Sequence, residues 1–229
     1  MTINRPASAA ADVRAAVADH ALWYHCIDVA GDLVTPGWFD LRPIVDSMPW
    51  PDLRGKRCLD IGTYDGFLAF EMERRGAAEV VATDIADHED WDWLPRERAR
   101  RAGQDLAEFA GEKGAGFRIA ASALGSSARR EVCSVYDLTT ERFGTFDVVT
   151  CGSLLLHLRD PFRALAAIRS VCDDLFLSAE AIDLPLTVAQ PRRPATFVYG
   201  DIGQWCVPNA AGHRRMVEVA GFDVLRAPR

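Results

Sequence analysis

The central part of the chain alternates short apolar runs with longer segments whose apolar residues recur at helical spacing. Short apolar runs bounded by Gly or Asp are typical of buried strands, and helical segments between them are typical of crossovers in a parallel sheet. The predicted strands are 57–61, 79–84, 132–135, 146–151, 175–178 and 222–225. The predicted helices are 8–25, 41–48, 67–75, 96–110, 116–124, 161–172 and 211–220. The pattern therefore predicts an α/β fold.

The segments outside this alternation set the predicted domain organisation. Pro49 and Pro51 end the N-terminal helical stretch just before the first strand. We therefore expect an N-terminal helical extension or lid over 1–50 and one α/β domain over 51–229. Residues 181–209 contain several prolines and follow neither period, so we expect them to be irregular.

Composition excludes several classes of protein. Of the 229 residues, 49% are hydrophobic and 26% are charged, as in a folded globular domain. A formal net charge of −7 disfavours nucleic acid as a partner, because binding to phosphates needs surplus Lys and Arg. The six cysteines include no Cys-x-x-Cys pair, and no apolar run reaches the length of a membrane span. We therefore expect a cytoplasmic protein with reduced cysteines and no contact with a membrane.

Three acidic residues stand at the ends of the first three predicted strands. Ligands of open α/β sheets bind beyond the carboxyl ends of the strands, so these positions face the expected site. Asp60 opens the pattern Asp60-x-Gly62-x-x-x-Gly66, whose glycines let the backbone approach a ligand closely. Asp84 stands where an acid accepts both hydroxyls of a ribose. Asp137 stands where a carboxylate can accept a hydrogen bond from an adenine amino group.

The loop after the first strand also distinguishes between two nucleotide-like ligands. A dinucleotide site requires G-x-G-x-x-G, but the corresponding positions are Gly62, Tyr64 and Phe67. An acid ahead of the glycines suits a ligand with an amino-acid end. Asp60 can hold its ammonium group, directly or through water, while N–H groups of the loop hold its carboxylate. The alternative is that the aspartates only cap helices and turns.

The segment 59–66, Leu-Asp-Ile-Gly-Thr-Tyr-Asp-Gly, resembles motif I of class I S-adenosylmethionine-dependent methyltransferases. The segments 146–149 and 154–161 resemble the fourth strand of that class and the loop after it. Trp-Tyr-His at 23–25 and Thr-Pro-Gly-Trp-Phe-Asp at 35–40 are similar to a narrower branch. That branch comprises relatives of the tRNA wobble-uridine methyltransferases, which use carboxy-S-adenosylmethionine, and related enzymes of secondary metabolism.

The resemblance implies a Rossmann-like class I methyltransferase fold, with a mostly parallel sheet and helices on both faces. It implies S-adenosylmethionine as the cofactor, with one tryptophan of the N-terminal extension closing over it. The cofactor-binding residues expected are Trp38, Asp60, Gly62, Thr63, Tyr64, Gly66, Asp84, Ile85, Tyr136, Asp137, Cys151 and Gly152.

The sequence departs from the tRNA-modifying branch at informative positions. The lysine that helps that branch hold the extra carboxylate has no counterpart near Tyr24 and His25, and a tyrosine of the fourth-strand loop is Leu156 here. We therefore expect ordinary S-adenosylmethionine and a small-molecule acceptor methylated on O or N. Class I enzymes also have a seventh, antiparallel strand. The chain stops at Arg229, so we expect that strand to be missing or another segment to supply the sheet edge.

Methyl transfer from a sulfonium needs positioning of the acceptor and, for some acceptors, a base. His157 is the leading candidate for the base because it follows the fourth strand and imidazole titrates near neutral pH. The alternative is a histidine that bonds the backbone and shapes the loop. His25, at the end of the predicted N-terminal helix, is the second candidate. No residue set predicts a metal site.

Other functions stay open at this point. One is a tRNA wobble-uridine-modifying methyltransferase, and another is a non-catalytic protein that binds S-adenosylmethionine or a partner. The arginine-rich segment 96–101 is the densest basic cluster, but Glu97 interrupts it, which is typical of a solvated helix face. The sequence does not fix the oligomeric state.

Overall fold

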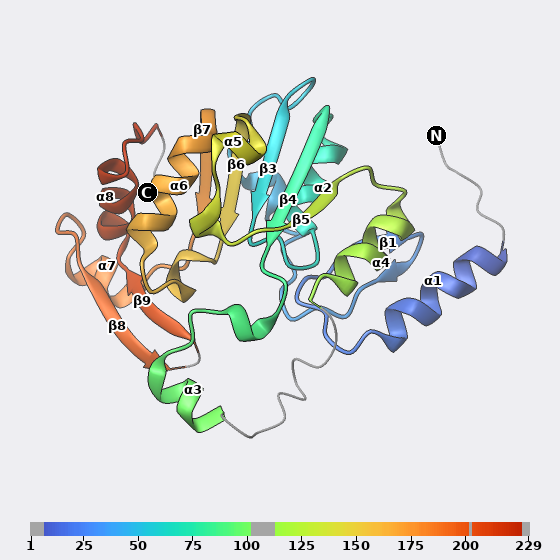
Figure 1. Cartoon of the computed structure of the whole chain (residues 1–229), viewed down its shortest axis with the longest axis horizontal. Coiled ribbons are helices and arrows are strands. Elements are labelled where there is room, and N and C mark those ends of the chain that lie inside the picture. Colours follow the sequence, from blue (N-terminus) through green and yellow to red (C-terminus); the bar gives the residue numbers. More distant parts are fainter. Residues whose placement is uncertain (1–6, 102–112, 202, 226–229) are drawn as a thin grey trace. The chain divides into compact units, whose positions relative to one another are not determined.

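The computed structural model describes residues 7–101, 113–201 and 203–225 (Figure 1). The chain divides into two compact units. The first comprises Met1–His88 with Leu106–Val132, and the second comprises Glu89–Asp105 with Cys133–Arg229. Five strands form a sheet in the order β5-β4-β3-β6-β7, and the pairings within each unit are parallel. A central parallel sheet with flanking helices confirms the predicted fold class.

The first unit contains the β-α-β segment that the sequence predicted. Its elements are β3 (Arg57–Ile61), α2 (Phe67–Arg74), β4 (Glu79–Asp84), α4 (Ala115–Leu124) and β5 (Arg129–Val132). Both β3 and β4 are almost entirely buried, because apolar side chains on both faces of the strands contact covering segments. Phe70 of α2 packs against Phe117 of α4, with ring centroids 5.0 Å apart. The predicted helix 116–124 is confirmed as α4.

The N-terminal segment of the first unit differs from its prediction. It contains α1 (Ala7–Asp19), β1 (Asp28–Ala30), β2 (Leu33–Val34) and the short 3-10 helix η1 (Val45–Ser47). The predicted helix 8–25 is wrong beyond Asp19. From there the chain is non-helical and His25 forms a parallel bridge with Phe39. The reason is that the backbone N–H groups of Tyr24 and His25 donate to a side chain, which removes them from helical bonding.

The second unit carries the rest of the sheet and an additional hairpin. Its helices are α3 (Pro95–Arg101), α5 (Thr140–Phe143), α6 (Pro161–Val171), α7 (Leu184–Ala189) and α8 (Ala210–Val219). Its strands are β6 (Phe146–Gly152), β7 (Cys172–Ala179), β8 (Thr196–Asp201) and β9 (Gln204–Pro208). Its 3-10 helices are η4 (Val135–Asp137) and η5 (Leu155–His157), and η2 (His88–Asp90) crosses the boundary of the two units. Asp160 caps α6 and Pro161 is its first residue, as predicted.

Three predictions for the strands need correction. The predicted strand 132–135 is displaced, because β5 ends at Val132 and Ser134 then caps η4. The predicted strand 222–225 is not formed, and the chain after α8 runs without ladder bonds over these residues. The segment 181–209, expected to be irregular, instead contains α7 and the β8–β9 hairpin (Figure 1). Of the predicted helix 96–110, α3 accounts for 95–101, and 102–112 lie outside the described residues.

Asn209 holds the end of this hairpin to its neighbours. Its side chain donates to the carbonyl oxygens of Gln190 and Arg193 and accepts from the N–H groups of Ala195 and Gly212. The side chain is fully buried, and the bond from Gly212 caps α8 as the sequence predicted. One amide therefore connects α7, the start of the hairpin and α8.

Candidate functional site

The loop after β3 has the tight backbone that the glycine pattern predicted. Gly62, Tyr64 and Gly66 all adopt positive φ, at 70°, 49° and 96°. Gly66 cannot be replaced without movement, because an added Cβ would lie 2.6 Å from the rings of Phe70 and Phe117. Asp60, at the end of β3, is 2% exposed. The sequence therefore folds 60–66 into a compact loop at the carboxyl end of the strand, where ligands of this fold bind.

Asp84, the predicted partner of a ribose, is engaged by three donors. Its carboxylate accepts the backbone N–H of Tyr64 at 2.9 Å and that of Ile85 at 2.8 Å. The ammonium of Lys113 lies 3.0 Å from the same carboxylate, and its side chain is 2% exposed. The carboxylate thus connects the loop after β3 to the loop after β4. Ile85 takes part through its backbone, because its carbonyl oxygen accepts from Arg130.

Lys113 is a candidate site residue that the sequence analysis missed. Its ammonium also lies 3.9 Å from the centroid of the Tyr64 ring. Burial lowers the pKa of Lys113, and the charge of Asp84 opposes that shift. No pattern in the sequence marks this residue, because it lies just before α4 and 29 positions after Asp84. The result is a buried ion pair at the centre of the candidate cofactor loops.

Tyr64 contacts one aromatic ring and one histidine. Its ring stacks on that of Tyr24 at 4.8 Å, and its hydroxyl lies 3.1 Å from Nε2 of His88. Burial raises the pKa of Tyr64 above its usual value, with smaller contributions from nearby carboxylates. Burial likewise lowers the pKa of His88 to about 4. Both groups are therefore neutral at physiological pH, and His88 belongs to this cluster instead of a metal site.

Asp65 fastens the N-terminal segment to the loop after β3. Its carboxylate accepts the backbone N–H groups of Tyr24 at 2.6 Å and of His25 at 3.0 Å. Burial raises the pKa of Asp65 to about 6, and the two backbone bonds oppose that shift. Asp65 stood inside the quoted motif but was not among the predicted site residues. Its partners lie about 40 positions earlier, so no local pattern could have identified the contact.

His25 and Trp38, both candidates from the sequence, lie in the same N-terminal segment. Nδ1 of His25 is buried without a hydrogen-bond partner, and burial lowers the pKa of His25 to about 4. Its ring centroid lies 5.7 Å from that of Phe67, the first residue of α2. Trp38 is 60% exposed, and its ring lies 6.3 Å from that of Tyr24. Thr63, another predicted residue, also has a buried hydroxyl without a partner.

In the second unit, His157 is held by a backbone contact through its ring. Its Nδ1 lies 2.9 Å from the carbonyl oxygen of Gly203. A carbonyl only accepts, so Nδ1 carries the proton and Nε2 carries the lone pair of the neutral ring. Burial lowers the pKa of His157, and the bond to Gly203 opposes that shift. The ring of Trp91 stacks on it at an interplanar angle of 17°.

Glu180, just after β7, is a second residue that the sequence analysis missed. Its carboxylate accepts the backbone N–H groups of Leu154 at 3.2 Å and of Leu155 at 3.1 Å, two residues before His157. Burial raises the pKa of Glu180 to about 7. Cys151 at the end of β6 is fully buried, and its thiol donates to the same carboxylate at 3.5 Å. Gly152, also predicted, is the last residue of β6 and stands beside this contact.

Tyr136 and Asp137, predicted to contact an adenine, lie in η4 of the second unit. The hydroxyl of Tyr136 donates to Asp92 at 2.5 Å and accepts the N–H of Asp160 at 3.1 Å. Burial and the bond to Asp92 raise the pKa of Tyr136. Asp137 is largely exposed, with Arg163 at 3.8 Å. The chain therefore uses Tyr136 to connect η4, the loop containing Asp92 and the start of α6.

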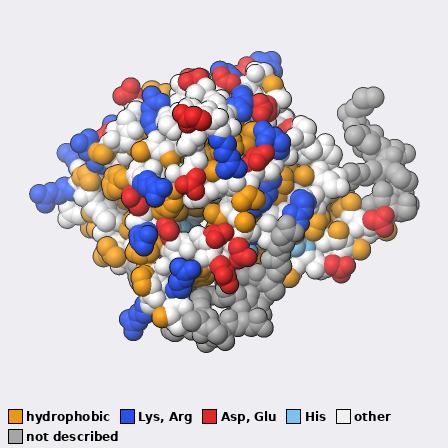
Figure 2. Space-filling model, viewed as in Figure 1, with side chains coloured by type: hydrophobic (Ala, Val, Ile, Leu, Met, Phe, Trp, Pro, Cys, Tyr) orange, Lys and Arg blue, Asp and Glu red, His pale blue; other side chains and the backbone are white. Residues whose placement is uncertain are grey.

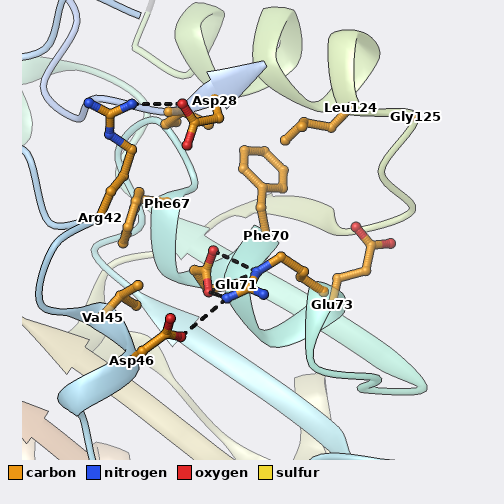
Figure 3. Close-up of a pocket in the computed structure, with 12 residues that line it drawn as sticks. Asp28, Arg42, Val45, Asp46, Phe67, Phe70, Glu71, Glu73, Leu124 and Gly125 are labelled. Atoms are coloured by element: carbon orange, nitrogen blue, oxygen red, sulfur yellow. Dashed lines mark hydrogen bonds and ion pairs between the residues drawn. The ribbon is translucent and has the colours of Figure 1, made fainter. Parts of the chain in front are cut away.

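A cavity of about 670 Å³ lies in the first unit and is lined in part by residues of α2 (Figure 3). Apolar and charged side chains line it together, and several charged ones are paired, as in Arg42–Asp28 and Arg74–Glu71. The residues that line it are Ile27, Asp28, Arg42, Val45, Asp46, Phe67, Phe70, Glu71, Glu73, Arg74, Leu124 and Gly125. Two of these lining residues also border the predicted site, because Phe67 contacts His25 and the ring of Phe70 lies against Gly66.

Charged side chains are interspersed on the face shown in Figure 2. Several arginines are paired with acids, including Arg57 with Glu79 and Arg54 with Asp52. In the predicted basic cluster Arg96 and Arg98 are exposed, but Glu97 between them is 4% exposed and so is not part of a solvated face. Among the described residues, no group of three His, Cys, Asp or Glu side chains could hold a metal ion. No described helix has the length and apolar character needed to cross a bilayer.

A family model matches most of the chain, and individual relatives align with a smaller part of it. A family model described as a methyltransferase domain matches residues 40–227. The ubiquinone biosynthesis O-methyltransferase of Neisseria meningitidis serogroup C is 35% identical over 54% of this chain and 41% of its own length. The enzyme of that name from Xanthomonas euvesicatoria is 31% identical over 66% and 50%. The chain therefore spans about half or less of the length of these relatives.

Solved structures share the fold at low identity. The [4+2]-cyclase SpnF has a TM-score of 0.57 at 18% identity, covering 94% of this chain and 70% of that one. Magnesium protoporphyrin IX methyltransferase from Synechocystis has a TM-score of 0.51 at 18% identity, covering 76% and 68%. At such identities these structures support the fold alone. The family match confirms the methyltransferase resemblance, while the wobble-uridine branch stays a prediction. The chain belongs to the family of methyltransferase domains.

Proposed function

We propose that this protein transfers a methyl group from S-adenosylmethionine to an oxygen or nitrogen of a small-molecule acceptor. The observation that carries the proposal is the compact loop 60–66, followed by Asp84 at the end of the next strand. An acid, a glycine loop and a second acid suit a ligand with an amino-acid end and a ribose. The names of the ubiquinone O-methyltransferases, which share about a third of aligned residues, favour an O-methyl acceptor.

The proposed roles in the first unit follow from what each group can donate or accept. Asp60 would hold the ammonium of the methionyl end, and the N–H groups from Gly62 to Gly66 would hold its carboxylate. Asp84 would accept from the ribose. Because it already accepts from Tyr64, Ile85 and Lys113, about one acceptor site on Oδ1 is left for a ribose hydroxyl, and a second hydroxyl would have to displace one of these donors.

The remaining roles are carried over from the sequence as proposals. Tyr136 and Asp137 would contact the adenine, and Cys151 and Gly152 would line the methyl-donor site. His157 would act as the base, with His25 as the second candidate. The neutral form of His157, with the lone pair on Nε2, is the form that a base requires. Residues 1–50 would form the lid and 51–229 the methyltransferase domain.

Two broader predictions also stay proposals. The partner is a small molecule, and the net charge of −7 continues to disfavour tRNA. The cytoplasmic location follows from the cysteine pattern described above. The wobble-uridine branch is one alternative, and a protein that binds the cofactor without catalysis is another.

The proposal is tested first by calorimetric titration with S-adenosylmethionine and with S-adenosylhomocysteine. We expect micromolar binding of both, weakened at least about tenfold in Asp60→Asn, because an ammonium ligand loses its charged partner. Glu131→Gln, at a half-buried position of β5 whose carboxylate pairs with Arg129, is the control. Labelled methyl transfer to catechols, phenols, amines and tRNA then identifies the acceptor class. If the wild-type protein bound neither compound, the proposal would be refuted. If methyl groups were transferred to tRNA alone, the small-molecule acceptor would be wrong and tRNA would take its place.

A further inference from the structure

Glu97 is a buried carboxylate whose position in the sequence suggested a surface. It lies in α3 between the exposed residues Arg96 and Arg98, yet it is only 4% exposed. Its Oε2 accepts the backbone N–H of Gly203 at 2.8 Å. A carboxylate is withdrawn from water at a high cost unless it gains a good partner, so this contact defines where the carboxylate lies.

Gly203 connects this carboxylate to His157. It belongs to the turn between the last residue of β8 and the first of β9, and its φ is +68°. Its N–H donates to Glu97, while its carbonyl oxygen accepts from Nδ1 of His157 at 2.9 Å. Both hydrogen bonds involve Gly203, so the carboxylate holds the residue whose carbonyl oxygen receives the ring proton.

The rest of the ring is constrained from other directions. Trp91 stacks on the imidazole, with centroids 6.3 Å apart. The backbone N–H of His157 donates to the carbonyl oxygen of Leu154 at 2.9 Å, and Glu180 holds the N–H of Leu154 in turn. Rotation of the imidazole, or loss of the proton from Nδ1, therefore breaks the bond to the Gly203 carbonyl.

We propose that Glu97 is a positioning residue that orients His157 through Gly203. The arrangement resembles a base and its orienting acid, with one residue of backbone between them. It keeps the proton on Nδ1 and leaves Nε2 with the lone pair that accepts a proton from an acceptor hydroxyl or amine. The inference rests on the proposed function of His157 as the base.

The state of the ring can be measured without an acceptor. The chain has five histidines, so ¹⁵N-histidine labelling gives few signals, and His157→Gln assigns the one of interest. We expect the wild-type protein at pH 8 to show His157 protonated on Nδ1 alone. In Glu97→Leu we expect averaged nitrogen shifts from both tautomers, because the Gly203 carbonyl loses its anchor. Glu97→Gln retains an oxygen that accepts from Gly203 and should restore the wild-type spectrum.

The matched control is Glu73→Leu in the first unit. Glu73 also accepts a backbone N–H, from Ser127 at 2.7 Å, and this variant should leave the His157 signals unchanged. If Glu97→Leu does not fold, Glu97→Asp, whose shorter side chain cannot reach Gly203 in place, takes over its role in the test.

Titration with S-adenosylhomocysteine in the same variants separates this inference from the function on which it depends. We expect the Kd of the Glu97 variants to stay within about twofold of the wild-type value, since Glu97 acts on His157 and not on the donor loop. A wild-type protein that binds no donor overturns the proposed function and this inference with it. A donor-binding protein whose Glu97→Leu or Glu97→Asp variant keeps the wild-type tautomer overturns this inference alone.

Discussion

Asp65 in the first unit and Glu180 in the second do the same work in different surroundings. Each carboxylate accepts two consecutive backbone N–H groups, from Tyr24 and His25 in one case and from Leu154 and Leu155 in the other. Each therefore fixes a segment that carries a candidate histidine. Burial raises both pKa values, to about 6 for Asp65 and about 7 for Glu180.

The difference lies in what happens to the histidine. Nδ1 of His25 is buried without a partner, whereas Nδ1 of His157 donates to a carbonyl oxygen. An anchored backbone alone therefore does not orient an imidazole, and a second contact to the ring is needed. The surroundings differ as well, because the charge of Lys113 lowers the pKa of Asp65 while only backbone and thiol donors lower that of Glu180.

The largest expected effect comes from removing the charge of Lys113. Lys113→Met leaves the carboxylate of Asp84 buried without its cation, so we expect a loss of about 3 kcal/mol in the free energy of unfolding. The exposed pair of Arg54 and Asp52 gives the control, because Arg54→Met should cost less than about 1 kcal/mol. Urea unfolding followed by circular dichroism measures both. Equal losses in the two variants would show that the Lys113 pair is not special.

A pH series compares the two carboxylates directly. A pKa raised on folding stabilises the folded state below the unfolded pKa, and that contribution is lost as pH rises through the folded pKa. For Glu180 the loss falls between an ordinary value of 4.5 and about 7. Glu180→Gln has no group that titrates in this range and so does not lose stability there. Its free energy of unfolding should therefore rise by on the order of 2 kcal/mol relative to that of the wild type between pH 4.5 and 8.

The corresponding window for Asp65 lies lower, between its ordinary value of 3.8 and about 6. Thermal unfolding of Asp65→Asn across the same pH series should therefore show its relative gain complete before that of Glu180→Gln. Coincident windows, or no gain in either variant, would contradict the assignment of these two groups.

Removing the carboxylate of Asp65 should destabilise only the segment that contains Tyr24 and His25. Asp65→Ala leaves the N–H groups of Tyr24 and His25 without their acceptor, so we expect local protection to fall by about 1–2 kcal/mol. Amide hydrogen exchange measures this at residues 24 and 25, with Leu154 and Leu155 as internal controls. Faster exchange at all four positions would indicate global destabilisation instead of a local anchor.

The smallest effect distinguishes the two rings. His25→Phe removes a nitrogen that has no partner, so at pH 8 we expect a stability change below about 1 kcal/mol. His157→Phe leaves the carbonyl oxygen of Gly203 without its donor and should cost about 1 kcal/mol more. Chemical denaturation of both variants tests this, and a larger loss in His25→Phe would reverse the comparison.

The features predicted from the sequence are those whose signals are local. The acid and glycines of 60–66, and Asp160 with Pro161 at the start of α6, act within a few residues of each other. Asp65 and His25 are 40 positions apart, and Glu97 and Gly203 are 106 apart, so no period or motif reports these contacts. The β8–β9 hairpin was missed because nearby prolines concealed two short strands.

The contacts of Asn209 have a consequence for how freely this part of the sequence can vary. Every partner of its side chain is a backbone atom, at Gln190, Arg193, Ala195 and Gly212. Backbone atoms are the same whatever residue supplies them, so positions 190, 193 and 195 can change without losing the contact. Gly212 has less freedom, because an added Cβ would lie 2.7 Å from the carbonyl oxygen of Ala195. A substitution at 209 removes contacts that no change of side chain at 190, 193 or 195 restores, because the partners there are backbone atoms.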